Sequence, residues 1–549
     1  MLSSIHFPVR SYSLEALQPD AGAKSATLML VKYEKSPPKD EQKGPEKAPG
    51  GEIPQGTARS FGALKEIEQG KLNSAEFVMD NLKLDKRGLL SLPVLLNTSD
   101  NAERASTKQE RSSIKKLSGH LIKHIAVKHA SKNKISLKES VKIIRHQFAQ
   151  AGTQLRNDKA WNTLNNTVSH NQSHYACTLV PASNMKLGAD DIFVQSYAGK
   201  GVCSSSTSEA KHAVNLWSSE ISVPDKEGKP VTLFKGLRHA ILSPFGMKKS
   251  DPTRQAGALA RAKEVATAAL YAKPELLKSA LAGQTVPLQI VSTALVTATK
   301  IIHEDTMLDD QMNAWQALSK TSPVSLSIRG ENGKLQEVKV NLGVAAFNFG
   351  VNELALKFGM GWSASDKHNA KALEQLIGGN AKTDAPPGGM VGAYLKSNPA
   401  NAAKVLELTQ QLQQIMANNA HHRDSGEPYK APQRIAMLAY EIGAVPCWNC
   451  KSGKDRTGML DAEIKREAIS HHQGQPLSQP GKPLDANNKK IFQQVLIGGG
   501  NHEIQAQNTS ASGNKVLKNI PLSAINLSYD ARVGDHQVWK ETQGLSKLV

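Results

Sequence analysis

The segment from Arg434 to His472 places the strongest constraint on how this chain can fold. An apolar helical stretch ends at Gly443, and a short strand-like run, Ala444–Asn449, follows it. A polar and basic loop comes next, and a second helix is expected from about Thr457 onward. A strand, a loop and a helix in this order are typical of an α/β domain. Backbone N–H groups converge at the amino end of such a helix, so the segment predicts an anion-binding site.

The loop carries a cysteine and an arginine six positions apart, Cys450 and Arg456. At a helix N-terminus beside positive charge the pKa of a thiol falls, so Cys450 is expected to be a thiolate near neutral pH. A thiolate attacks phosphorus and takes the phosphoryl group covalently. The planar guanidinium of Arg456 binds two phosphoryl oxygens at once. The pair therefore predicts phosphate-ester hydrolysis through a cysteinyl-phosphate.

The other residues of the loop have predicted supporting roles. Ser452 is expected to hydrogen-bond the sulfur, and Gly453 to permit a tight backbone path. Two lysines add positive charge at the rim, which suits a substrate with more than one phosphate. The predicted substrate-binding residues of the loop are Lys451, Ser452, Gly453, Lys454, Thr457 and Gly458.

A leaving alkoxide needs a proton, and two aspartates are candidates for the general acid. Asp455 lies inside the loop and is the first candidate. Asp424 lies upstream, in a segment with Gly and Pro that could close over the site, and the sequence leaves the choice open. Asp461 and Glu463 are expected on the helix surface instead.

Other chemistries fit the loop less well. A nucleotide-binding phosphate loop needs Ser or Thr after its Gly-Lys pair, and here Asp455 stands in that place. Zinc would require ligands besides the cysteines, and the adjacent pair His471 and His472 is not spaced for chelation. No metal and no cofactor is predicted.

Cys447 and Cys450 form a C-x-x-C pair, but no short βαβ domain of the thioredoxin kind accompanies it. Cys447 is expected to be a small buried strand residue. The alternative is a reversible disulfide that protects Cys450 from over-oxidation.

With 549 residues the chain is too long for a single hydrophobic core. Four cysteines are too few for a disulfide-built domain and predict folding in a reducing compartment. No cleavable signal peptide is visible, and the most apolar stretch, Val286 to Ile302, is interrupted by polar residues, so no membrane-spanning helix is expected. The net charge of +19 favours anionic partners.

Four regions are predicted along the chain. Residues 1–35 lack clear periodicity, and residues 36–58 form a Pro-, Gly- and Lys-rich linker that is expected to be disordered. Residues 59–180 form a mainly helical region, with 13 Lys and Arg against three acidic residues between Lys108 and Lys159. Its basic surface is interpreted either as ordinary solvation or as a docking surface for an acidic partner. Its two apolar helix faces consist of Ile114, Leu117, Leu121 and Ile125, and of Leu137, Val141, Ile144 and Phe148.

Residues 181–549 are expected to form the α/β domain. Predicted strands are Asp191–Val194, Val231–Phe234, Pro323–Ile328 and Val338–Leu342, and predicted helices are Gln255–Ala272, Asp366–Ile377, Ala402–Ala417 and Gln433–Ile442. The predicted fold is therefore a cysteine-phosphatase-like α/β domain, with a strand, phosphate loop and helix, preceded by a mainly helical region.

Three segments resemble the SopB/IpgD (SigD) family of bacterial type III-secreted inositol phosphate phosphatases. They are the loop Asn449–Gly458, which also resembles that of mammalian inositol polyphosphate 4-phosphatases, the motif Ala346–Glu353 and the C-terminal stretch Asn508–Lys515. The resemblance runs across roughly residues 160–549 and more weakly into the basic helical region. Within the second motif, Asn348 and Asn352 are predicted to bind inositol hydroxyls, to brace the catalytic loop or to cap a helix.

The resemblance implies roles for residues and regions of this chain. Cys450 would be the nucleophile, Arg456 the phosphate ligand, and Lys515 a residue that supports activity toward a particular phosphate position. Residues 107–170 would bind a Rho-family small GTPase, and residues 1–35 would carry signals for secretion and for a secretion chaperone. The substrates would be phosphoinositides and inositol polyphosphates, met after type III secretion into the host cytoplasm and peripherally on host membranes.

Two classes of function follow. The first is an enzyme, a Mg²⁺-independent phosphomonoesterase acting on inositides. The alternative is a GTPase-binding effector in which catalysis is secondary. Nucleic-acid binding ranks low because only 5% of residues are aromatic and no interleaved basic and aromatic module is present.

Overall fold

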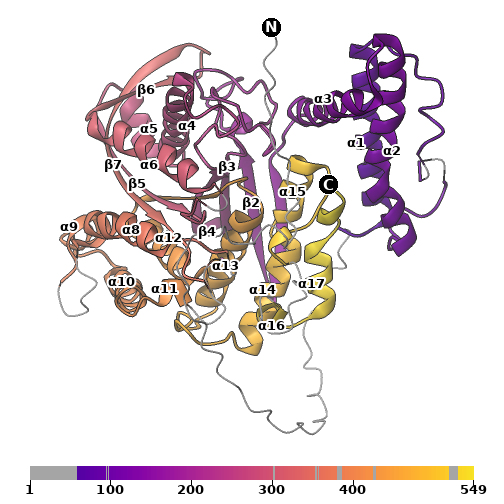
Figure 1. Ribbon diagram of the computed structural model, residues 1–549. Coiled ribbons are helices and arrows are strands. Elements are labelled where there is room, and N and C mark those ends of the chain that lie inside the picture. The colour runs from indigo at the N-terminus through magenta and orange to yellow at the C-terminus, as the bar shows by residue number, and fades with distance from the viewer. Residues whose placement is uncertain are drawn as a thin grey trace, which may run out of the picture. The chain divides into compact units, whose positions relative to one another are not determined.

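A computed structural model describes residues 58–93, 95–96, 98–300, 303–352, 355, 358–379, 386–423, 428–517 and 530–549 (Figure 1). The predicted secretion region, residues 1–35, lies outside these ranges. Residues 36–57 of the predicted linker and the candidate acid Asp424 also lie outside them.

Three helices near the amino end of the described chain (Figure 1) share a core, which also includes Ala511 and Leu545 from the C-terminal region. They are α1 (Phe61–Asn81), α2 (Lys108–Asn133) and α3 (Leu137–Asn157). Each begins after a Ser or Thr whose side chain accepts a hydrogen bond from the backbone three residues on, which satisfies an otherwise free N–H. At α2, Thr107 and Glu110 complete a reciprocal capping box.

The apolar face predicted for α2 is confirmed, because all four of its residues are buried. On α3, Ile144 is buried, Val141 and Phe148 are partly buried, and Leu137 is 43% exposed. The lysines and arginines between these apolar positions mostly face solvent.

An eight-stranded sheet forms the centre of the larger domain, with the order β1-β2-β3-β4-β8-β5-β7-β6. The four inner strands β4, β8, β5 and β7 pair in parallel, and the outer strands pair antiparallel. The strands are β1 (Leu164–His170), β2 (Ser173–Pro181), β3 (Trp217–Pro224), β4 (Pro230–Ala240), β5 (Val286–Ala294), β6 (Val324–Arg329), β7 (Leu335–Asn348) and β8 (Val445–Cys450).

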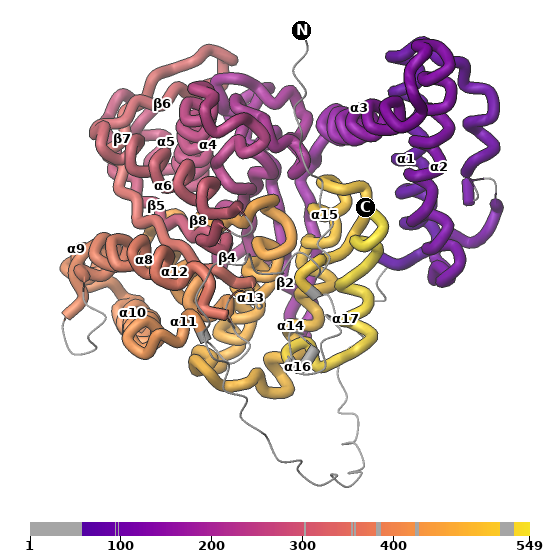
Figure 2. The backbone as a smooth tube through the Cα atoms, viewed as in Figure 1, coloured from indigo at the N-terminus to yellow at the C-terminus, as the bar shows by residue number. Residues whose placement is uncertain are grey.

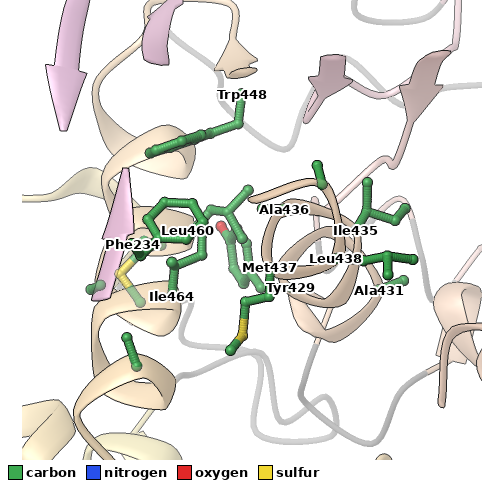
Figure 3. Close-up of a cluster of buried hydrophobic side chains, with 14 of the residues drawn as sticks. Phe234, Tyr429, Ala431, Ile435, Ala436, Met437, Leu438, Trp448, Leu460 and Ile464 are labelled. Atoms are coloured by element: carbon green, nitrogen blue, oxygen red, sulfur yellow. The ribbon is translucent and has the colours of Figure 1, made fainter. Parts of the chain in front are cut away.

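Helices cover both faces of the sheet and make two separate cores. One core is built largely from α4 (Pro252–Tyr271), α5 (Pro274–Leu281) and α6 (Asp305–Lys320). The other takes residues from α8 (Trp362–Ile377), α9 (Gly389–Leu395), α10 (Ala402–Ala417), α12 (Lys430–Glu441), α13 (Asp455–His472), α14 (Ala486–Gly498), α16 (Asp530–Val533) and α17 (His536–Gln543). Figure 3 shows part of this second core, where Met437 of α12 lies on the side of Leu460 and Ile464 of α13, and Ile435 points to the opposite side of α12. Two further helices are α11 (Ala420–Arg423) and α15 (Asn501–Thr509).

The central strand β8 is buried along all 6 of its residues, as expected for a parallel strand covered on both faces. It lies between β4 and β5 (Figure 2). Because side chains alternate along a strand, Trp448 and Cys450 belong to one core and Cys447 to the other.

Most predicted elements are present, with shifted ends. The strands at 231–234, 323–328 and 338–342 are parts of β4, β6 and β7, and the helix at 402–417 is α10. The strand predicted at Asp191–Val194 was wrong. The Asp191 carboxylate there accepts hydrogen bonds from the Ser196 hydroxyl and the Tyr197 N–H, and these local bonds favour a turn over a ladder.

The sheet begins earlier than the sequence predicts. β1 and β2 lie before the expected boundary at residue 181, yet they pair with each other and with β3. The three-helix unit accordingly ends with α3 at Asn157. The apolar stretch that begins at Val286 forms strand β5. The sequence indicated there only the absence of a membrane-spanning helix. In the part of the chain that the structure describes, no helix is long and apolar enough to cross a membrane.

Candidate active site

The predicted loop lies between the carboxyl end of β8 and the amino end of α13. Cys450 is the last residue of β8, residues 451–454 form the loop, and α13 begins at Asp455, two residues before the predicted start. The loop therefore lies at the carboxyl edge of a parallel sheet, where α/β domains bind ligands, and at the N-terminus of an 18-residue helix.

The backbone of the loop follows a path that requires glycine at position 453. Gly453 has a φ of +67°, and a Cβ there would lie 2.5 Å from the backbone nitrogen of Ala240. The carbonyl of Cys450 accepts hydrogen bonds from Ile241 N–H at 2.9 Å and Gly453 N–H at 3.3 Å. Gly453 thus keeps the loop close against the end of β4.

The thiol of Cys450 is buried, with 1% of the residue exposed. Burial by itself raises the pKa of this thiol. The charge of Arg456 and hydrogen bonding from Thr457 outweigh burial and hold the pKa below its ordinary value of 9.0. Ser452 Oγ lies 3.9 Å from the sulfur.

Arg456 is fixed by an ion pair that the sequence did not predict. Its Nη1 donates to the Leu295 carbonyl at 2.8 Å and to Glu304 Oε2 at 3.0 Å, and its Nη2 donates to Glu304 Oε1 at 2.6 Å. A guanidinium has five N–H donors in one plane, so these bonds leave Nε–H and one Nη2–H, which point the same way. Two parallel N–H donors of this kind have the geometry to bind two oxygens of a phosphate.

Glu304 stands immediately before α6 and is itself well held. Its Oε2 also accepts a hydrogen bond from Thr297 N–H at 2.8 Å. Burial raises the pKa of this carboxyl, but the charge and hydrogen bonds of Arg456 lower the pKa by more than burial raises it. The pKa therefore lies below its ordinary value, and the group is a carboxylate. Glu304 and Arg456 are 152 positions apart, and only the order of strands in the sheet brings them together.

Asp455 links the loop to the C-terminal stretch Asn508–Lys515, one of the three segments that resemble the family. One carboxylate oxygen accepts from Lys454 Nζ at 3.1 Å and the other from Lys515 N–H at 2.8 Å. The Asn514 side chain also donates to the Asp455 carbonyl at 3.0 Å. The structure thus brings Lys515 to the catalytic loop, and the Lys515 ammonium contacts the Val549 carbonyl at 3.1 Å.

These contacts affect the protonation of Asp455. Burial raises its pKa, and Lys454, together with the hydrogen bond from Lys515 N–H, brings it below the ordinary value of 3.8. Without substrate, Asp455 is therefore a carboxylate. A phosphate dianion in the loop would compete for Lys454 and would raise the pKa of Asp455 again.

The two lysines predicted at the rim differ in their surroundings. Lys451 is half-buried, with its ammonium 5.0 Å from the centre of the Phe245 ring, and burial lowers its pKa. Lys454 is 8% exposed and is paired with Asp455. Lys451 is thus the more accessible of the two.

Thr457 and Gly458 lie in the first turn of α13 and are buried. The Thr457 carbonyl accepts a hydrogen bond from Trp448 Nε1 at 3.2 Å. A Cβ on Gly458 would lie 2.9 Å from Asn501 Oδ1, so glycine allows the close approach of α15. Thr457 and Gly458 therefore hold the start of α13 against β8 and α15.

Two side chains that the sequence did not predict, Asn215 and Arg238, contact carbonyls of the loop. Asn215 donates to the Ser452 carbonyl at 3.1 Å and accepts from Asn508 Nδ2 at 2.8 Å. Arg238, fully buried on β4, reaches the Gly453 carbonyl at 3.5 Å. No local pattern around Asn215 or Arg238 signals these contacts, since both partners lie more than 200 positions away.

Asn348 has the contacts of a brace. It is fully buried, and its amide donates to the carbonyls of Ala294 and Val296 at 3.1 and 2.8 Å. These carbonyls flank Leu295, which accepts from Arg456. Of the three roles predicted for this residue, the structure therefore supports bracing. Asn352 is exposed, and its Oδ1 accepts from Ala355 N–H at 3.3 Å, which is a capping contact. Glu353 lies outside the described residues.

Two expectations about α13 were wrong. Asp461 and Glu463 are both 1% exposed instead of lying on the surface. Asp461 pairs with Lys465 at 2.9 Å and with Arg238 at 3.4 Å, and Glu463 accepts from Arg532. Their helix is buried along most of its length, so its charges are compensated internally.

Cys447 is buried, and burial alone lifts the pKa of its thiol out of the physiological range. It lies three residues before Cys450 on β8, and its side chain belongs to the other core. All four cysteines are free thiols. The position is that of the expected buried strand residue.

Comparison with known proteins shows the family of this chain. A family described as enterobacterial virulence protein IpgD matches residues 83–549. The chain belongs to the SopB/IpgD family. It is 51% identical to the inositol phosphate phosphatase SopB of Salmonella typhi over 82% of this chain and 80% of that protein. It is 40% identical to the inositol phosphate phosphatase IpgD of Shigella flexneri over 89% of this chain and 94% of that protein.

A solved structure of a Legionella phosphoinositide phosphatase has a similar fold, with a TM-score of 0.60 over 89% of this chain and 90% of that one. Its sequence is only 11% identical, so this likeness concerns the fold. Membership of the SopB/IpgD family makes the chain a phosphatase.

The lowered pKa of Cys450 predicts selective alkylation. A thiol with a lowered pKa is deprotonated at lower pH, so inactivation by iodoacetamide should rise with pH to a plateau with its midpoint below 9. Cys447 should stay unlabelled in the folded protein, as mass spectrometry of the peptides would show. Arg456→Ala should move the midpoint upward, because the Arg456 charge lowers the pKa. A midpoint at or above 9 in the parent would contradict this account.

The ion pair predicts that Glu304 positions Arg456. Glu304→Gln keeps the side-chain volume but removes the charge, and the guanidinium then loses its fixed orientation. We expect kcat/KM for an aryl phosphate to fall by about 10–100-fold, since small misplacements of a catalytic group have effects of this size. Asp309→Asn, which removes an exposed carboxylate from the same helix α6, is the matched control. Parental kcat/KM in Glu304→Gln would show that Arg456 is positioned by other contacts.

Proposed function

We propose that this chain hydrolyses phosphate esters of inositol, both phosphoinositides and inositol polyphosphates, through a cysteinyl-phosphate on Cys450. The observation that carries the proposal is the Cys450 thiol, whose pKa is lowered by Arg456 at the amino end of α13. The names of the relatives, inositol phosphate phosphatases SopB and IpgD, support the substrate class.

In the first step the phosphate enters the loop, where the backbone N–H groups and the free fork of Arg456 bind its oxygens. The thiolate of Cys450 attacks phosphorus, an S–P bond forms, and the ester P–O bond breaks. The leaving alkoxide takes a proton from the general acid, for which Asp455 is our proposal. The hydroxyl of Ser452 hydrogen-bonds the sulfur and stabilises it as a leaving group in the next step.

In the second step water attacks the phosphorus of the cysteinyl-phosphate. The carboxylate of Asp455 accepts the proton from this water, the S–P bond breaks, and inorganic phosphate leaves with Cys450 again a thiolate. Arg456 binds the equatorial oxygens in both steps, so one fixed guanidinium serves both transition states.

The lysines near the loop favour a substrate with several phosphates. Lys451 is half-buried at the rim, and Lys515 lies beside Asp455. Each adds a positive charge next to the reacting phosphate, where a second phosphate of an inositol ring would be bound. We propose Lys515 as a residue that selects the ring position.

The mechanism predicts that Cys450→Ser abolishes phosphate release, because a serine hydroxyl stays protonated near neutral pH and is a far weaker nucleophile than a thiolate. The measurement is phosphate release from a panel of all phosphoinositides and inositol polyphosphates. Lys515→Ala should change the ranking within this panel and leave an aryl phosphate nearly unaffected. Near-normal release by a folded Cys450→Ser variant would rule out the cysteinyl-phosphate.

The role of Asp455 is tested through the leaving group. Asp455→Asn should lower the rate on inositol phosphates by about 10²–10⁴-fold, since an alkoxide cannot leave without a proton. The rate with p-nitrophenyl phosphate, whose leaving group needs no proton, should fall far less. An equal loss on both substrates would assign Asp455 a positioning role and return Asp424 as the candidate acid.

We further propose that the chain acts as a secreted effector on host inositides, with a secretion and chaperone-binding region at residues 1–35. The description of its family as a virulence protein supports this setting. Contact with host membranes would be peripheral and electrostatic.

A second candidate function is the binding of a Rho-family small GTPase by the three-helix unit. What favours it is the exposure of the basic residues on α2 and α3, among them Lys115, Lys116, Lys123, Lys138 and Lys142. The full-length triple variant Lys115→Glu, Lys116→Glu, Lys123→Glu should lose binding to nucleotide-loaded GTPases in a pull-down. Lys226→Glu, an exposed lysine elsewhere, is the control, and unchanged binding by the triple variant would refute this surface.

A further inference from the structure

Two histidines and an aspartate from two helices converge at a point that involves no residue of the loop 450–458. His421 and His422 lie on the short helix α11, and Asp366 lies in the second turn of α8. The Nε2 atoms of His421 and His422 are 3.0 and 2.7 Å from the same atom, Asp366 Oδ1. One ligand atom from each of the three residues falls within 4.8 Å of the others.

Aromatic neighbours hold the two imidazoles in place. Trp362 is one helical turn before Asp366 and stacks on His422, with ring centres 4.6 Å apart and planes at 15°. The edge of Phe349 meets His421 at 5.9 Å. Because packing fixes both rings, their Nε2 atoms stay directed at one point, as a preorganised metal site requires.

The ligand types and spacing suit zinc. Two neutral imidazoles and one carboxylate are a common three-residue set for this ion, with a solvent molecule in the fourth position. At Zn–N and Zn–O distances near 2.0–2.1 Å, tetrahedral ligand atoms lie about 3.3 Å apart, so each Nε2 atom would move away from Asp366 Oδ1 by about half an ångström or less.

Exposure and charge fit the same ion. The side chains of His421 and His422 are 2% and 7% exposed, whereas that of Asp366 is 47% exposed, so water can reach the carboxylate side. The three ligands together contribute one negative charge, that of Asp366. With a bound dication the site would carry a net positive charge, and a water or hydroxide can occupy the fourth ligand position.

We propose that Asp366, His421 and His422 form a binding site for a zinc ion. The ion would fasten α11 to α8. Helix α8 also carries Ser365 and Asn369, which hydrogen-bond Asn348, the brace beside Leu295 and Arg456. Any effect of the ion on phosphate-ester hydrolysis would therefore be indirect, through the position of α8.

The experiment uses the full-length chain with Cys450→Ser, which removes the reactive thiolate as a competing ligand. We expect one equivalent of Co²⁺ to bind with the visible absorption of a four-coordinate nitrogen and oxygen site, and Zn²⁺ to displace it. Zn²⁺ should also raise the temperature of thermal unfolding. Asp366→Asn and the double variant His421→Ala, His422→Ala should bind at least about tenfold more weakly and lose both signals.

The matched control is the other adjacent histidine pair. His471→Ala, His472→Ala should bind Co²⁺ like the parent. Asp366→Asn alters a half-exposed side chain without changing its volume, so its fold should survive, and circular dichroism without metal checks this. Parental Co²⁺ absorption in Asp366→Asn would overturn the proposal. Failure of the parent to bind Co²⁺ or Zn²⁺ at stoichiometric ratios would also overturn it and leave a hydrogen-bonded His–Asp–His cluster.

Discussion

The candidate site depends on a strand that is buried on both faces. β8 lies between two parallel neighbours, β4 and β5, and ends at Cys450. A strand in this position cannot shift by one residue without exchanging the residues of two cores, so its register is firmly set. The position of Cys450 is therefore fixed by packing across the whole sheet, and the loop that follows it starts from a fixed position.

A second constraint is the compensation of charge around α13. This helix begins at the loop and runs through the interior, with five charged residues buried along it, Asp461, Glu463, Lys465, Arg466 and Glu467. Partners on β4, α12 and α16 satisfy them, such as Arg238 and Arg434. Removing one partner of such a pair leaves an uncompensated buried charge, at a cost of about 3–5 kcal/mol. The network ties the position of α13, and so of Arg456, to three other elements.

The sequence predicted what is local to the loop and missed what is distant. The strand, loop and helix around Cys450, the pair with Arg456 and the role of Gly453 follow from short-range patterns of apolar residues and glycine. Glu304, Asn215 and Arg238 were missed because each meets the loop only through the strand order β4-β8-β5, which no local pattern encodes. The burial of Asp461 and Glu463 was missed for a related reason, since charged residues on a helix normally indicate a solvated face. The strand expected at Asp191 failed because a single carboxylate satisfied nearby backbone N–H groups.

The contacts of the loop also bear on how activity arises during folding. Ser452 is held by a residue 237 positions earlier, Arg456 by one 152 positions earlier, and Asp455 by one 60 positions later. Contacts of such long sequence separation form late, because the chain between them must first be ordered. A partly folded chain contains Cys450 but has neither the fixed guanidinium nor the closed loop. Phosphatase activity thus requires the completely folded domain. A newly made or incompletely refolded molecule does not hydrolyse phosphate esters.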